Sequence, residues 1–155
     1  MKHEIFLYFD GPLPRTTAQE KGEKVCYRWQ RVGNTTKKVP YISHYRKPEV
    51  EAARTLYAYK LKPYRPKTPS ILPIKIEVFA YFDIKDRSKW GKYKPTKPDA
   101  ENWIKELADV MTQLGYWKDD NQIVDLHIVK YFAEKASIVI RWEELSDGKQ
   151  GTGNV

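Results

Sequence analysis

One amphipathic helix, predicted between residues 99 and 114, constrains the fold more than any other segment of the sequence. Its apolar residues recur at the spacing of a single helical face, namely Ile104, Leu107, Ala108, Met111 and Leu114. Asp99 before this run is typical of a helix N-cap, and Gly115 after it is typical of a helix end. A helix with one apolar face must bury that face against another layer of structure.

Strand-like segments occur on both sides of this helix. Residues 74–82 place an apolar residue at every second position, and residues 4–9, 122–132 and 136–142 also favour strands. A second helix should begin at Pro48, with acidic residues in its first turn, and end before Pro63. We therefore predict an α+β fold for residues 1–145, a single small domain in which a mixed β-sheet packs with two main helices. We expect residues 146–155 to form a disordered tail.

Residues 15–48 are polar, basic and weakly patterned. Residues 25–32 could be extended, and Gly33-Asn34 is a turn signal. We expect a long loop here, containing one hairpin at most.

Positive charge is unevenly distributed along the chain. Residues 1–97 carry 22 Lys or Arg against 9 Asp or Glu, a balance of +13, whereas residues 98–155 carry 6 against 11, a balance of −5. A basic body attracts phosphates, and an acidic region can supply oxygen ligands to a metal ion. Many basic proteins bind no nucleic acid, so charge alone leaves nucleic-acid binding undecided.

Cysteine content and hydropathy limit the cellular compartments in which we expect this protein. The single cysteine, Cys26, excludes an intrachain disulfide and a Cys-rich zinc site, and favours a reduced compartment. No apolar run approaches the roughly 20 residues of a membrane span, and the N-terminus lacks the apolar core of a signal peptide. We expect a soluble, cytoplasmic protein without a membrane partner.

The stretch between residues 85 and 97 has the character of a DNA-binding loop. Cations can neutralise phosphates while aromatic rings stack on bases. The alternative is a solvated loop whose charge is incidental. The candidate DNA-binding residues are Lys85, Arg87, Lys89, Trp90, Lys92, Tyr93, Lys94 and Lys97.

Carboxylates occur at both ends of the predicted helix. Metal-dependent phosphodiester hydrolysis would require a few such carboxylates to converge on the metal ion. Asp99 and Glu101 lie at the N-terminal end of the helix, and Asp119 and Asp120 follow it. A helix of about 15 residues separates these ends by roughly 20 Å, so the acids meet only if the chain folds back or a second subunit completes the site. The alternatives are helix-capping acids, a simple turn, and a surface ion pair of Glu101 with Lys105.

The order of residues from Pro98 to Lys130 resembles the RusA family of Holliday junction resolvases. The resemblance is carried by Pro98-Asp99-Ala100-Glu101-Asn102, then Lys105, Asp109, a Gly-aromatic pair, Asp119-Asp120, Gln122 and Lys130. It implies a RusA-like endonuclease that makes paired symmetric nicks in four-way DNA junctions during recombination and repair. The family acts as a homodimer with Mg²⁺ or Mn²⁺, and two-fold symmetry suits two equivalent strands.

The resemblance also implies roles for individual residues. Asp99, Glu101 and Asp120 would bind the metal, and Lys105 would be a catalytic or phosphate-contacting lysine. Asn102, Asp119 and Gln122 would support them, and Lys130 would join the DNA-binding residues.

Glu101 departs from the family pattern, which usually has Asp at this position. The additional methylene moves the carboxylate by over an ångström, in a site whose Mg²⁺ is sensitive to geometry. A weakly active or non-catalytic branched-DNA-binding protein is therefore the main alternative. A nuclease acting on other branched or flap DNA shares the same chemistry, and nucleophilic catalysis through Cys26 or His44 lacks partner residues at suggestive spacing.

Overall fold

A four-stranded sheet forms the body of the protein. The computed structural model describes residues 2–18 and 20–146. The strands β1 (Lys2–Tyr8), β4 (Ile74–Asp83), β5 (Ile123–Ala133) and β6 (Ser137–Glu144) are ordered β1-β6-β4-β5. β4 and β5 are parallel, and the other pairs are antiparallel, so the predicted mixed sheet is confirmed.

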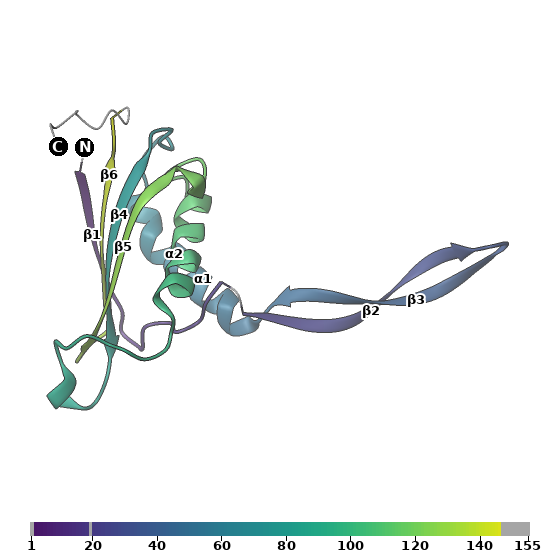
Figure 1. Cartoon of the computed structure of the whole chain (residues 1–155), viewed down its shortest axis with the longest axis horizontal. Helices are drawn as coiled ribbons and strands as arrows, with labels where there is room; N and C mark the ends of the chain where they lie inside the picture. Colours follow the sequence, from purple (N-terminus) through teal and green to yellow (C-terminus); the bar gives the residue numbers. More distant parts are fainter. Residues whose placement is uncertain (1, 19, 147–155) are drawn as a thin grey trace, which may run out of the picture.

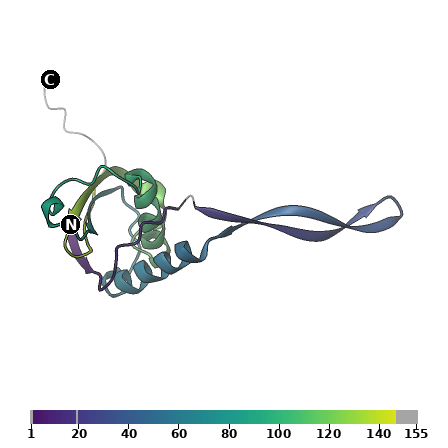
Figure 2. The same cartoon turned by 90° about the horizontal axis from the view of Figure 1, so that it is seen from below.

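Two helices cover one side of this sheet (Figures 1 and 2). They are α1 (Pro48–Leu61) and α2 (Ala100–Leu114), as predicted, and α2 connects the parallel strands β4 and β5. Three short 3-10 turns lie at Lys62–Tyr64 (η1), Arg87–Lys89 (η2) and Asp120–Gln122 (η3). The α+β fold class is confirmed.

The core lies between the sheet and the helices. Every second residue of β4 is buried, from Ile74 to Phe82, which matches the alternation in the sequence. The ring of Trp103 on α2 packs edge-on against Tyr57 of α1 and Phe82 of β4. The two helices and the sheet therefore meet at Trp103.

Both ends of α2 are formed by the residues that the sequence indicates. The Asp99 side chain accepts a hydrogen bond from the Glu101 backbone N–H at 3.0 Å, which satisfies one free donor of the first turn. Gly115 adopts a left-handed conformation with φ of 87°, which a residue with a Cβ adopts only at a cost in free energy.

Residues 21–46 differ from the predicted long loop. They form two 12-residue strands, β2 (Lys21–Val32) and β3 (Thr35–Arg46), paired as an antiparallel hairpin that projects away from the body (Figures 1 and 2). The predicted hairpin is therefore present but much longer than expected. Its alternation is weak in the sequence because most residues on both faces are exposed.

The predicted tail at 146–155 lies outside the described residues except for Ser146. Across residues 2–18 and 20–146, no helix combines the length and apolarity needed to span a bilayer.

Candidate active site

The chain turns back after α2, which resolves the separation of the predicted acids. Beyond Gly115, the backbone of residues 116–118 pairs with Ser70, whose N–H donates to the Tyr116 carbonyl at 3.2 Å. The Lys118 N–H donates to the Ser70 carbonyl, also at 3.2 Å. This pairing directs the chain towards η3, and β5 then runs back beside α2 (Figure 1).

Asp119 and Gln122 hold the turn that carries Asp120. The Asp119 carboxylate accepts from the Asn121 N–H at 2.9 Å, and the Asp119 N–H donates to Gln122 Oε1 at 2.8 Å. Gln122 Nε2 also donates to the carbonyls of Ser70 and Leu72, both at 2.9 Å. These contacts fix η3 to the segment that precedes β4.

Asp120 consequently lies beside the middle of α2. It shares a pocket of about 270 Å³ with Lys105 and Asp109. The remaining lining is mostly apolar and comes from α2 and from the first residues of β5, namely Ile104, Ala108, Ile123, Val124 and Leu126.

Asp99 and Glu101 lie further towards the N-terminus of α2. Glu101, Lys105 and Asp109 are spaced four residues apart and share one helical face, with about 6 Å of helix axis between neighbours. Glu101 is therefore one turn from the pocket, and Asp99 is at the cap. Among residues 2–18 and 20–146, no three His, Cys, Asp or Glu side chains converge closely enough to hold a metal ion together.

The charges around Asp120 oppose its ionisation. A hydrogen bond with Asp119 and the negative charges of Asp119 and Asp109 raise the pKa of Asp120, with burial adding to the effect. The pKa of Asp119 is lowered, chiefly by the Asn121 N–H. Asp109 has a cation nearby, with Arg54 Nη1 at 3.7 Å from its carboxylate. Within the part of the chain described, Glu101, Lys105 and Asp120 form no ion pair, so a positive ion beside Asp120 would be favoured electrostatically.

Lys130 holds the segment in front of α2 in place. Its Nζ donates to the carbonyls of Thr96 at 2.7 Å and Pro98 at 2.6 Å. Burial lowers the pKa of Lys130, and the negative charge of Asp99 partly offsets this effect. These contacts give Lys130 a structural role at the start of α2, and its predicted contact with DNA stays a prediction.

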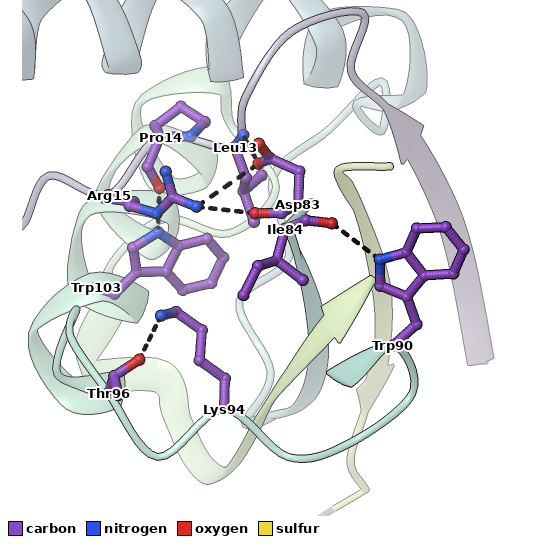
Figure 3. Close-up of polar contacts among 9 residues, drawn as sticks. All are labelled: Leu13, Pro14, Arg15, Asp83, Ile84, Trp90, Lys94, Thr96 and Trp103. Atoms are coloured by element: carbon purple, nitrogen blue, oxygen red, sulfur yellow. Dashed lines mark hydrogen bonds and ion pairs between the residues drawn. The ribbon is translucent and has the colours of Figure 1, made fainter. Parts of the chain in front are cut away.

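The basic loop at 85–97 is anchored to the body (Figure 3). Trp90 Nε1 donates to the Ile84 carbonyl at 2.8 Å, and backbone hydrogen bonds join Lys92 and Lys94 to the edge of β5. Lys94 is buried, bonds Thr96 at 2.6 Å and lies over the ring of Phe82, so it points inward rather than to solvent. The exposed members of the predicted set are Lys85, Arg87, Lys89, Lys92, Tyr93 and Lys97.

Two features of the site were not predicted as functional. Asp109 lines the pocket with Asp120, and its place one turn after Lys105 could have indicated this. The residues at the base of the hairpin line a neighbouring hollow that also includes Asp109.

The predicted supporting residue Asn102 is half-buried on α2.

A comparison with protein families gives this site its context. The sequence model described as Endodeoxyribonuclease RusA matches residues 25–143. This chain belongs to the RusA family. The match includes all the predicted acids and Lys105, together with most of the long hairpin, so the arrangement described above lies within the RusA domain.

Two curated relatives extend the comparison. The chain is 39% identical over 74 residues to the crossover junction endodeoxyribonuclease rusA of Lactococcus phage r1t, covering 48% of this chain and 56% of that protein. It is 31% identical over 94 residues to the uncharacterized protein YqaN of Bacillus subtilis (strain 168), covering 54% of this chain and 66% of that protein. The chain thus spans between about half and two thirds of the length of these two relatives.

Proposed function

We propose that this protein is a divalent-metal-dependent endodeoxyribonuclease that resolves four-way DNA junctions by paired symmetric nicks, in recombination and repair. One observation carries the proposal: the turn after α2 brings Asp120 into one pocket with Lys105, on the helical face that also carries Glu101. Membership of the RusA family and the similarity to the phage r1t enzyme support the same activity.

The available side chains suit Mg²⁺ or Mn²⁺ by their chemistry. Asp99, Glu101 and Asp120 are the candidate ligands, since hard cations prefer carboxylate oxygens and Mg²⁺ retains several of its waters. Because these three do not converge within the described residues of one chain, a second subunit would complete the site. The bound ion would neutralise phosphate charge and activate the attacking water. The accumulation of negative charge beside Asp120 supports this assignment.

The chain's own residues perform the remaining tasks. Lys105, exposed at the rim of the pocket, contacts a phosphate oxygen of the strand to be cut. Asp119 and Gln122 position Asp120 through the η3 turn. The exposed cations of residues 85–97 guide the strand towards the pocket.

We further propose that the protein acts as a homodimer, because two nicks in equivalent strands require two sites. Apolar surface in the lining of the pocket supports this, since Val124 and Leu126 are 63% and 47% exposed. Sedimentation should give twice the mass of the 18.3 kDa chain. A monomeric mass at the concentration at which the protein cuts junctions would contradict the dimer.

Cleavage of a synthetic four-way junction tests the proposal. Wild-type protein with Mg²⁺ or Mn²⁺ should nick opposing strands symmetrically, and Asp120→Asn should retain junction binding while losing cleavage. Asp125→Asn is the matched control, because Asp125 lies on β5 and pairs with His127 at 2.9 Å outside the pocket. If Asp99→Asn and Asp120→Asn both cut at the wild-type rate, the site assignment is wrong.

Glu101 supports a second candidate function, a branched-DNA-binding protein with weak or no catalysis. Its longer side chain shifts the carboxylate in a geometry that Mg²⁺ constrains closely. This candidate predicts salt-sensitive junction binding without cleavage under any divalent metal.

A further inference from the structure

The β2–β3 hairpin has the dimensions of a DNA-binding arm. Each strand has 12 residues, which at about 3.3 Å per residue gives a length of roughly 40 Å. One turn of B-DNA is about 34–36 Å long, and a two-stranded ribbon fits its major groove. The hairpin projects from the body without another element beside it (Figures 1 and 2).

The charge of the hairpin is complementary to a polyanion. Between residues 21 and 46, Glu23 is the only acid. The same range contains seven cations, spread from the base of the hairpin to its tip: Lys21, Lys24, Arg28, Arg31, Lys37, Lys38 and Arg46. Such a distribution attracts phosphates along the whole length of the ribbon.

Apolar side chains form a strip along one face of the same hairpin. The strand register pairs Val25 with Ile42 and places Tyr27 and Trp29 on that face. Their exposed fractions are 61% for Val25, 62% for Ile42, 58% for Tyr27 and 72% for Trp29. An isolated two-stranded hairpin is marginally stable in water, so an exposed strip of this size indicates a bound partner.

Charge decides between the partners that this strip could contact. A second copy of the hairpin would bring seven further cations against the first seven, and like charges across an interface oppose association. Several cations instead lie over the hairpin's own rings, with Lys38 Nζ 5.0 Å from the Tyr27 centroid and Arg28 Cζ 5.6 Å from the Tyr41 centroid. Aromatic and cationic groups are thus interleaved, as DNA contact requires.

The base of the hairpin adjoins the candidate active site. A hollow at this base is lined by Lys21 and Arg46 of the hairpin, by Arg54 of α1 and by Asp109 of α2. Asp109 also lines the pocket that contains Lys105 and Asp120. An arm rooted here can contact the same DNA whose strand enters the pocket.

We propose that the β2–β3 hairpin lies in the major groove of the duplex next to the cleavage point. There, its cations contact phosphates and the Val25–Trp29 face meets the base edges. The proposal rests on the proposed function for the location of the cut, but it requires only DNA binding and no catalysis.

A hairpin shortened in register provides the first test. Deleting residues 25–30 together with their partners 37–42 removes six residues from each strand and keeps the Gly33-Asn34 turn. Hydroxyl-radical footprinting on a four-way junction in EDTA should show protection shortened by about six base pairs, since six residues span roughly 20 Å. Guanine N7 protection from dimethyl sulfate, which reports major-groove contact, should disappear over the same base pairs.

A charge variant provides a second test that leaves the chain length intact. Lys21→Gln, Arg31→Gln and Lys38→Gln remove three cations from the face that carries Val25 and Trp29. Combined, they should flatten the dependence of log affinity on log salt by roughly two to three units, at about 0.9 per lost phosphate contact. The matched control removes three exposed cations of the body, by Lys2→Gln, Lys62→Gln and Lys135→Gln, and should leave the slope unchanged.

The outcomes separate the two proposals. A wild-type footprint and salt slope in both hairpin variants would overturn the DNA arm, as would a change of sedimenting mass in the shortened variant with an unchanged footprint. Wild-type protein that binds junctions through the hairpin but cuts none with Mg²⁺ or Mn²⁺ would refute the proposed nuclease activity and support the arm.

Discussion

Replacing Gln122 by Ala tests whether the η3 turn determines the position of Asp120. The Gln122 side chain makes three hydrogen bonds, two as donor to the Ser70 and Leu72 carbonyls and one as acceptor from the Asp119 N–H. Each bond contributes about 0.5–1.5 kcal/mol, and partial exposure of the turn favours the lower values. For three bonds, the expected loss in the free energy of unfolding is therefore about 1.5–3 kcal/mol.

Urea unfolding measures this loss directly. With an m-value of about 2 kcal/mol/M, the midpoint should fall by roughly 0.75–1.5 M. Gln122→Glu should behave similarly, because it keeps the acceptor oxygen but loses both donors. Gln113→Ala is the matched control, since Gln113 is exposed on α2 and makes no side-chain hydrogen bond to another described residue.

Gln122 acts through Asp120, so a second measurement distinguishes positioning from a purely structural role. Junction binding in EDTA should be retained in Gln122→Ala, whereas kcat for junction cleavage should fall at temperatures where the variant is fully folded. A variant that unfolds within about 0.5 kcal/mol of wild type and cuts at the wild-type rate would refute the reasoning, because neither the three bonds nor the turn would then matter.

Three further predictions concern other parts of the molecule. Lys130→Met should lower the free energy of unfolding by about 2–4 kcal/mol, because two carbonyls lose a charged donor. Lys135→Met, in the exposed turn, is the control and should change the free energy of unfolding little. Thermal unfolding measures both variants, and equal Tm values would contradict the prediction. Burial raises the pKa of Glu106, so the free energy of unfolding should fall as pH rises from about 4.5 through the raised folded-state pKa. Urea titrations at several pH values measure this fall, and Glu106→Gln should remove it. Glu101→Asp should raise the cleavage rate with Mg²⁺ relative to Mn²⁺, and an unchanged ratio would show that the additional methylene does not limit the enzyme.

The four-stranded sheet and the two helices could be predicted from the sequence because their buried residues recur at regular spacings. β4 alternates strictly, and α2 carries one apolar face between an Asp cap and a terminal glycine. Each of these patterns records which side chains face the core, so the alternation and the helical spacing could be read without coordinates. The same reasoning placed Asp99 at the cap of α2.

The hairpin and the meeting of the acids could not be predicted in the same way. β2 and β3 bury little on either face, and the short alternation at Val25, Tyr27 and Trp29 is not enough to predict two 12-residue strands. The position of Asp120 depends on contacts between Gln122 and residues about 50 positions earlier in the chain. Such long-range contacts leave no local pattern, although the family resemblance had already singled out the residues that they hold.

The docking of the basic loop on β5 has a consequence for the behaviour of the sheet at high concentration. β5 is an edge strand, and unpaired edges template association with other chains. Backbone bonds from Gly91 and Lys94 to Phe132 and Lys130 close the C-terminal half of this edge with the protein's own chain. A folding intermediate in which residues 91–94 have not yet docked would expose that half, so aggregation should compete most strongly with folding at this step.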